Sequence, residues 1–262
     1  MRSLNIAATG MLAQQLNVEV ISNNIANMNT TAYKRQRADF QDLLYQNLER
    51  IGATSADSGE IVPSGIQIGL GVKAGSVYRV TEQGNLISTG NKIDLAIQGR
   101  GYFQVQLPNG DNGYTRAGAL QLSPNGELVT ADGFLLNPAI TVPQAAEDIF
   151  INKTGEVQAK ISGAVDPSVV GQIQLTTFFN AAGLEAIGDN LFLETPASGT
   201  ASAGTPGSSG GVGTLLQGFL KTSNVNPVNE ITSLITAQRA YEMNSKVIQA
   251  SDEMLSVTSN LR

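Results

Sequence analysis

Four carboxylates in the central region are the side chains best suited to do chemistry in this sequence. Asp94, Asp111, Glu127 and Asp132 lie among short strand-like segments, and a pair of carboxylates is all that a glycoside hydrolase needs. However, aromatic residues make up only 5% of the chain and Trp is absent, so no aromatic sugar platform accompanies them. Scattered acids are common on any soluble surface. A secreted β-rich carbohydrate-active enzyme is therefore kept as an alternative of a different class.

Two missing residue types exclude most other kinds of catalysis. The 262 residues include no His and no Cys. This excludes a Ser-His-Asp triad, a thiolate nucleophile, a disulfide framework and a Cys-based zinc site. We therefore expect no catalytic, cofactor-binding or metal-binding residue, and a chain that is not an enzyme.

Two short motifs resemble ligand-binding loops but are better explained as turns. Gly69, Gly71 and Ala74 have the spacing of a dinucleotide fingerprint, which requires a helix to follow. The residues that follow, 76–80, have the β-branched and aromatic character of a strand. Residues 109–113 suggest a calcium loop but lack its ordered ligands and distal Glu. We expect a hairpin turn there.

Charge and hydropathy exclude further partners. The formal net charge is −6, which argues against nucleic-acid binding because that binding needs Lys and Arg on the phosphates. No window approaches the ~20 apolar residues of a membrane span, so we expect no direct membrane insertion. Residues 1–28 lack the unbroken apolar core of about 7–15 residues found in a signal peptide. We expect no cleaved signal, and export by another route stays open.

Both ends of the chain have the pattern of long helices that present a heptad seam. The N-terminal seam recurs every seven residues from about Leu4 to Met28, and the C-terminal seam does so after Asn226-Pro227, which suits a helix start with Asn as N-cap. We expect the two ends to pair. The seam residues are Leu4, Met11, Val18 and Ile25, and Leu234, Tyr241, Ile248 and Leu255.

The middle of the chain has the pattern of short strands joined by tight turns. Asn109-Gly110, Asn125-Gly126 and Asp132-Gly133 are hairpin dipeptides between strand-like segments. Their spacing favours a sandwich or a barrel-like β domain. Residues 195–214 carry no charge and are dominated by Gly, Ser, Ala, Thr and Pro. This composition predicts a linker or loop and not a strand.

The expected fold class is thus α+β. Long N- and C-terminal helices pair as a coiled-coil-like unit, and a central antiparallel β-rich domain lies between them in the sequence. We expect a discontinuous helical polymerisation domain in residues 1–35 and 215–262. Residues 36–75 form a connecting segment, 76–195 a β-rich outer domain, and 195–214 the linker.

Three segments in their order along the chain resemble a known family. Residues 22–30 with Tyr33-Lys34 resemble the N-terminal signature of the flagellar axial proteins of rod and hook, and residues 223–225 with 237–242 resemble their C-terminal signature. Residues 94–103 and 114–118 resemble the start of the family's middle domain. Within the family, residues 63–72 and the chain length are similar to the distal rod member. An adhesin or secreted binding module would not explain why the signatures occupy both heptad ends.

The resemblance implies a structural subunit that self-assembles into a helical tube and transmits torque from motor to hook. It implies export by the flagellar type III apparatus without a cleaved signal, and a place in the basal body that spans the periplasm. The implied partners are other copies of the chain, proximal rod proteins, hook protein and the surrounding P- and L-ring proteins. A hook or proximal rod protein of the same family is the nearer alternative.

The expected interface residues are the seam positions and the signature side chains. The signature residues are Asn27, Thr30, Tyr33, Lys34, Asn224, Gln238 and Arg239, and for the first four a purely local role in a helix terminus and turn is equally well supported. The family usually has Gly before the aromatic-Lys pair, whereas this chain has Ala32. If that Gly supplies a positive φ, Ala32 predicts a somewhat different turn.

Overall fold

The computed structural model describes residues 2–48, 65–162, 166–208 and 210–260. Residues 49–64 of the expected connecting segment, including Pro63 and Ser64 of the distal-rod-like stretch, lie outside the described residues. The chain divides into two compact units. The helical unit comprises Met1–Ala26, Gln36–Arg79 and Asn226–Arg262, and the β unit comprises Asn27–Arg35 and Val80–Val225.

This division differs from the expected one in several places, one of which is that residues 76–79, expected in the β-rich outer domain, belong to the helical unit. The connecting segment joins the helices in one unit, because its strands pack against the N-terminal helix. Residues 27–35 and 215–225, expected with the helices, belong to the β unit.

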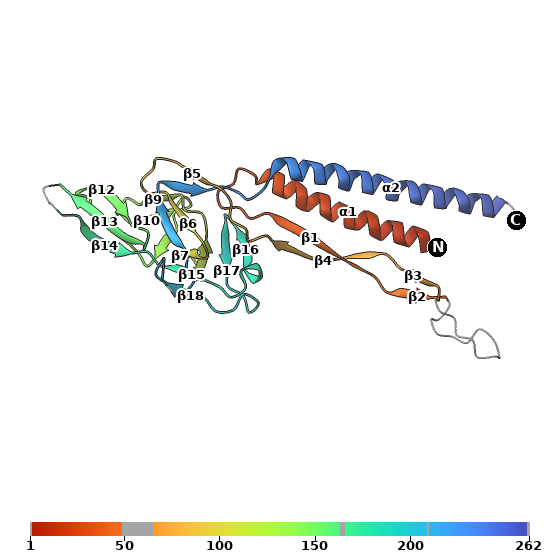
Figure 1. The fold of residues 1–262 in the computed structure, drawn as a ribbon, viewed down its shortest axis with the longest axis horizontal. Coiled ribbons are helices and arrows are strands. Elements are labelled where there is room, and N and C mark those ends of the chain that lie inside the picture. The colour runs from red at the N-terminus through yellow and green to blue at the C-terminus, as the bar shows by residue number, and fades with distance from the viewer. Residues whose placement is uncertain (1, 49–64, 163–165, 209, 261–262) are drawn as a thin grey trace. The chain divides into compact units, whose positions relative to one another are not determined.

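Two long helices and a two-stranded ribbon make up the described part of the helical unit. The ribbon strands pair antiparallel as β1 with β4 and β2 with β3. Figure 1 shows the two helices side by side, with the ribbon along the N-terminal one. The elements are α1 (Arg2–Ala26), β1 (Gln36–Asp42), β2 (Tyr45–Asn47), β3 (Gln67–Gly69), β4 (Val72–Arg79) and α2 (Pro227–Asn260).

The predicted start of α2 is confirmed. The side-chain oxygen of Asn226 accepts hydrogen bonds from the backbone N–H groups of Val228 at 3.1 Å and Asn229 at 3.3 Å. This is the N-cap arrangement, with Pro227 at the first helical position. No Gly or Pro follows to interrupt the 34 residues of the helix.

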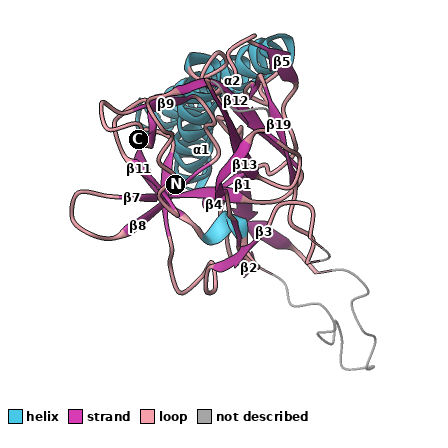
Figure 2. Cartoon of the chain, turned by 90° about the vertical axis from the view of Figure 1, so that its left-hand side faces the viewer, coloured by secondary structure: helices cyan, strands magenta, loops and turns pink. Residues whose placement is uncertain are grey.

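The β unit is built almost entirely of strands and loops (Figure 2). Its largest sheet joins nine strands of the described chain, in the order β16-β17-β8-β7-β11-β10-β9, with β15 and β18 added beside β7. Smaller antiparallel groups are β12-β13-β14, β19-β6 and β20-β5. The strands are β5 (Leu86–Ser88), β6 (Leu95–Gln98), β7 (Tyr102–Gln106), β8 (Asn112–Thr115), β9 (Leu120–Leu122), β10 (Leu128–Thr130), β11 (Leu135–Asn137), β12 (Ala146–Ile151), β13 (Glu156–Ile161), β14 (Ser168–Gln172), β15 (Leu175–Thr177), β16 (Glu185–Gly188), β17 (Leu191–Leu193), β18 (Ser202–Gly204), β19 (Thr214–Gln217) and β20 (Phe219–Lys221), with a short 3₁₀ helix η1 (Ala181–Gly183).

All three predicted hairpin turns are confirmed. Asn109-Gly110 joins β7 to β8, Asn125-Gly126 joins β9 to β10, and Asp132-Gly133 joins β10 to β11. Each of the three glycines has a positive φ, between 82° and 89°, which a residue with a Cβ rarely adopts.

The expectation of a strand-free segment at 195–214 is wrong. β18 lies inside it and pairs with β15 through Ser202, Ala203 and Gly204. The small side chains of this strand carry no local β signal, so its pairing depends on a partner far away in the sequence.

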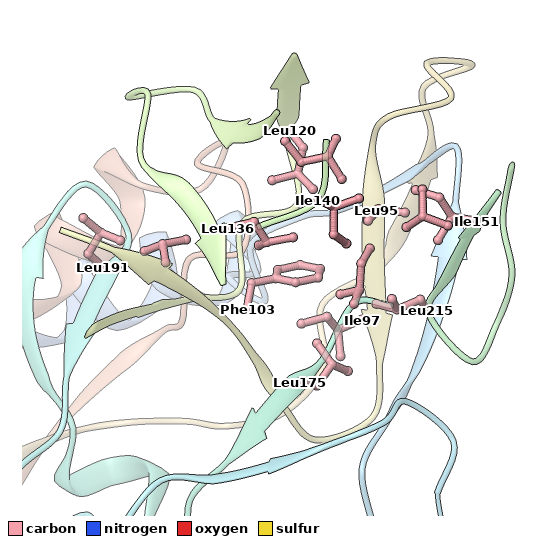
Figure 3. Close-up of a cluster of buried hydrophobic side chains, with 14 of the residues drawn as sticks. Leu95, Ile97, Phe103, Leu120, Leu136, Ile140, Ile151, Leu175, Leu191 and Leu215 are labelled. Atoms are coloured by element: carbon pink, nitrogen blue, oxygen red, sulfur yellow. The ribbon is translucent and has the colours of Figure 1, made fainter. Parts of the chain in front are cut away.

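One apolar core holds the sheets of the β unit together. Phe103 lies at its centre, with Leu136, Ile97 and Leu175 around the ring (Figure 3). Its members come from β6, β7, β11, β15 and β19, among other strands, so several sheets are packed about the same core. Gly118 allows the close approach this needs, because a Cβ there would lie 1.6 Å from the backbone oxygen of Leu95.

Candidate assembly surface

The two helices meet along a row of small and polar side chains, which we call the contact row. It consists of Ser3, Gly10 and Asn24 of α1 with Ser251, Asn244 and Glu230 of α2. The Ser251 hydroxyl donates a hydrogen bond to the Ser3 hydroxyl at 3.3 Å. A Cβ on Gly10 would lie 2.9 Å from the amide nitrogen of Asn244. The Asn24 side chain meets Glu230 at 3.1 Å. In these pairs the residue number rises along α1 as it falls along α2, so the two helices run antiparallel. The paired positions recur at multiples of seven residues.

The predicted seam lies beside this contact row. Leu4, Met11 and Ile25 each directly follow a residue of the contact row, and Val18 lies at the equivalent position of the heptad between them. All four are half-buried. On α2, Leu234, Ile248 and Leu255 are half-buried while Tyr241 is 44% exposed. The heptad period was therefore read correctly, but the closest contacts fall on its smaller neighbours. Their interface role in the polymer stays a prediction.

Asn24 joins α1, α2 and the ribbon at one point, and sequence reasoning did not single it out. Its side-chain oxygen accepts from the backbone N–H of Gln36, and its amide nitrogen donates to the Gln36 carbonyl, both at 2.8 Å. The same nitrogen donates to the Glu230 carboxylate. Asn24 is 1% exposed and Glu230 is 2% exposed. An Asn at the end of a helix next to another Asn gave no sign of this role, because both partners are distant in sequence.

The N-terminal signature forms a turn within the β unit. The Thr30 hydroxyl donates to the side-chain oxygen of Asn27 at 3.0 Å, and the Tyr33 N–H donates to the Thr30 carbonyl at 3.3 Å. Ala32 has a φ of 59° and is buried. The expectation of a different turn is therefore wrong, because Ala32 adopts the left-handed conformation that usually calls for Gly.

Lys34 lies buried inside the β unit, and its expected interface role stays a prediction. Its ammonium group donates to the Glu82 carbonyl. Burial, with the positive charge of Arg116 adding to it and Glu82 opposing it, lowers the pKa of Lys34 to about 8. The side chain is 9% exposed, and its ammonium group is used within its own chain.

Two further cations, Lys221 and Arg116, are buried in the β unit, and no local pattern predicts the burial of either. Lys221 donates to the Ile97 carbonyl at 3.3 Å, and Arg116 donates to the Gly99 carbonyl at 2.7 Å. The pKa of Lys221 is lowered to about 7, by burial first and then by the charges of Arg116 and Lys34. These cations bind carbonyls along the end of β6, so their role is internal.

Asn224 is a second amide clamp, also internal to the β unit. Its side-chain oxygen accepts from the Arg35 N–H at 2.7 Å. Its amide nitrogen donates to the carbonyls of Val80 and Glu82, each at 3.1 Å. These hydrogen bonds lie within its own chain, and the expected interface role of Asn224 stays a prediction.

The remaining signature side chains lie around an open groove on the helix pair. Gln238, Tyr241 and Glu242 of α2 face Gln15, Val18 and Glu19 of α1 across a hollow of about 540 Å³. Arg239 lies next to the groove in sequence and is exposed. The groove of the helical unit thus combines the apolar Val18 and Tyr241 with two carboxylates, and Arg239 is exposed beside it.

Two of the four carboxylates of the enzyme alternative, Asp94 and Asp111, hold turns. Asp94 is buried and accepts hydrogen bonds from Thr89 at 2.6 Å and Asn91 at 3.0 Å. Asp111 accepts from Asn109 at 2.7 Å within the exposed turn. Across the described ranges, no three acidic side chains gather in a way that could hold a metal ion. None of the helices described there is long and apolar enough to cross a membrane.

Three family models match the sequence in chain order. The model "Flagella basal body rod protein" matches residues 4–34, which cover α1 and the N-terminal turn. The model "Flagellar hook protein FlgE/F/G D1 domain" matches residues 96–159. The model "Flagellar basal body rod FlgEFG protein C-terminal" matches residues 216–261, which cover α2.

Curated relatives match along the whole chain. The flagellar basal-body rod protein FlgG of Caulobacter vibrioides is 61% identical over 262 residues, which is all of both chains. The protein of the same name from Agrobacterium fabrum is 53% identical over 99% of this chain and 98% of its own. That of Bacillus subtilis is 40% identical over 100% of this chain and 99% of its own. This chain therefore belongs to the family of flagellar basal-body rod proteins.

Proposed function

We propose that the chain is a structural subunit of the flagellar distal rod, which self-assembles into a helical tube and transmits torque from the motor to the hook. The observation that carries this proposal is the end-to-end similarity to flagellar basal-body rod proteins, with 61% identity over 262 residues. The similarity includes both terminal helices, which are the elements that carry the groove and the exposed apolar side chains.

The exposed surface of α2 supports self-assembly. Ile235 is 45% exposed, Met243 62% and Met254 63%. Large apolar side chains gathered on one side of a helix are stabilised when a partner covers them. A surface that binds a different surface of the next copy does not close, and it therefore generates a helical polymer. Torque would pass through many such weak contacts along the tube.

The interface residues proposed for the polymer lie on the helical unit and the N-terminal turn. They are the seam residues with Gln238, Arg239 and Tyr241, and with Asn27, Thr30 and Tyr33 as positioning residues in the turn. Proximal rod proteins would meet one end of the tube and hook protein the other, with the P- and L-ring proteins around it. We place the subunit in the basal body, where the rod spans the periplasm. We propose that it is exported by the type III apparatus without a cleaved signal and that it has no enzymatic activity.

A hook or proximal rod protein is the second candidate, because the family models name rod and hook proteins together. Deleting the gene and imaging isolated basal bodies by electron microscopy separates the candidates. The distal-rod proposal expects particles that end in a short proximal rod, with neither distal rod nor hook. Complete rods that lack a hook would assign the chain to the hook instead. Normal flagella in a strain with no second copy of the gene would contradict both.

A further inference from the structure

One side of α2 forms a stripe in which two apolar residues alternate with two basic residues. We call it the outer stripe: Ile235, Arg239, Met243 and Lys246, which follow one another at spacings of three or four residues and therefore share a face. All four are exposed. Arg239 and Lys246 are the two basic residues within α2. In the described part of the helical unit, no element other than α1 packs extensively on α2 (Figure 1).

The groove between α1 and α2 has the opposite charge. We call it the acidic groove: Gln15, Val18, Glu19, Gln238, Tyr241 and Glu242. Val18 and Tyr241 give it an apolar floor, and Glu19 and Glu242 give it two carboxylates without any basic lining residue. The Gln15 amide donates to the Glu19 carboxylate at 3.1 Å and so holds that side chain.

The charges of the two surfaces are not neutralised inside the subunit. In the stretches that the structure describes, Arg239, Lys246, Glu19 and Glu242 form no ion pair. The stripe and the groove also match in character, since each combines apolar side chains with charges of a single sign. Complementary charge of this kind sets which surfaces meet and in which register.

We propose that the outer stripe of one copy docks in the acidic groove of the next copy, with Arg239 entering between Glu19 and Glu242. The occupant of the groove is thus a second copy of this chain. A guanidinium group suits this place because its planar fork can bond two carboxylates while its stem packs on the apolar floor. This inference rests on the proposed function and adds to it which two surfaces form the repeating contact.

The contact is heterologous, because each copy uses its stripe toward one neighbour and its groove toward another. Glu242 of the groove comes three residues after Arg239 and four before Lys246, so the stripe and the groove are neighbours around α2 and meet at Glu242. A heterologous contact extends without limit, as a tube requires.

Cysteine cross-linking tests the contact directly, because the natural chain has no Cys. Glu19→Cys and Arg239→Cys are placed on separate copies with tags of different size and expressed together in cells without their own copy of the gene. Basal bodies are isolated and oxidised with copper phenanthroline. We expect a mixed covalent dimer that carries both tags. Ser233→Cys replaces Arg239→Cys in the control, since exposed Ser233 lies about a third of a turn away around α2, and we expect at least tenfold less mixed dimer.

The outcomes distinguish the two proposals. Basal bodies that contain both variants but give no more mixed dimer than the Ser233 control overturn the docking contact and leave the rod function intact. Copies that never enter the basal body, even as the unmodified chain, overturn the proposed function and the contact with it.

Charge reversal gives an independent readout in the same cells. We expect Arg239→Glu and Glu19→Arg each to lower the number of complete rods per cell about tenfold, and the double variant to restore most of the loss, because charge pairs at interfaces couple strongly. Asp252→Arg, on the same helix but outside the groove, is the matched control and should have little effect. Equal losses in the double variant and the single variants would contradict the pairing.

Discussion

The side chain of Asn24 pairs with the backbone of Gln36 as a neighbouring strand would, accepting from its N–H and donating to its carbonyl at 2.8 Å each. The Asn24 amide also donates to Glu230 at 3.1 Å. One buried side chain therefore links α1 to the first residue of β1 and to the first turn of α2.

Replacing this amide should loosen the helical unit. We expect Asn24→Ala to lower the free energy of unfolding by about 2–4 kcal/mol, because it removes three hydrogen bonds, one of them to the buried Glu230 carboxylate. Asn24→Asp should be at least as harmful, since a carboxylate cannot donate to Glu230 and repels it. Asn5→Ala on the exposed side of α1 is the control. Thermal unfolding followed by circular dichroism measures the change, and an Asn24→Ala protein as stable as the Asn5 variant would contradict the role.

Ala32 offers a stabilising substitution. Its φ of 59° lies in the left-handed region, which costs a residue with a Cβ about 1–2 kcal/mol. Glycine avoids that cost but loses about 0.4–1 kcal/mol through the greater freedom of the unfolded chain. We expect Ala32→Gly to raise the free energy of unfolding by roughly 0.5–1 kcal/mol, measured by urea denaturation. Ala8→Gly inside α1 should instead destabilise the protein, by about 1 kcal/mol.

The outcome at Ala32 shows how far local signals extend. The hairpin dipeptides, the Asn226 cap and the heptad repeats act through neighbouring residues, so the sequence predicted the helices, the turns and the α+β class. The left-handed turn at Ala32 is held by a hydrogen bond from its N–H to the Lys221 carbonyl at 2.8 Å. A partner so distant in sequence overrides the preference of alanine, and a local rule cannot foresee it.

The same limit explains the residues that sequence reasoning missed or misplaced. Asn24 and Glu230 are 206 residues apart, and Lys221 and Ile97 are 124 apart. Lys34 is expected at an interface because it belongs to the N-terminal signature, and in the fold its ammonium group donates to the Glu82 carbonyl. Polar residues of this kind look like surface residues until the pairing of distant segments is known.

The two buried lysines predict an unusual dependence of stability on pH. The pKa of Lys34 falls from 10.5 to about 8, and that of Lys221 from 10.5 to about 7, with burial the largest cause of each. Between these values and 10.5 the unfolded chain binds more protons than the folded chain. The free energy of unfolding should therefore rise as the pH increases from about 7 to about 10, and it should be lowest below pH 7.

The composition makes this measurement clean. The chain has no His and no Cys, so few other groups titrate between pH 6 and about 9. Urea denaturation across this range should show the rise, and Lys221→Met should make it smaller. Lys160→Met, at an exposed position of β13, should leave the slope unchanged. A flat profile for the natural chain would show that both lysines keep their charge in the folded state.

The last prediction separates assembly from folding by changing one seam residue. Ile248 is half-buried beside the contact row of the helix pair, and a carboxylate there costs about 2–3 kcal/mol because it loses apolar burial and must be hydrated. The core of the β unit is formed by other residues, among them Phe103, Leu136 and Leu175. We therefore expect Ile248→Asp to abolish rod assembly, seen by electron microscopy of basal bodies, while hydrogen exchange in β7 and β11 stays as slow as in the natural chain. Gln249→Asp adds the same charge at an exposed neighbour and should still assemble. Normal rods built from the Ile248→Asp chain would mean that the seam carries none of the assembly.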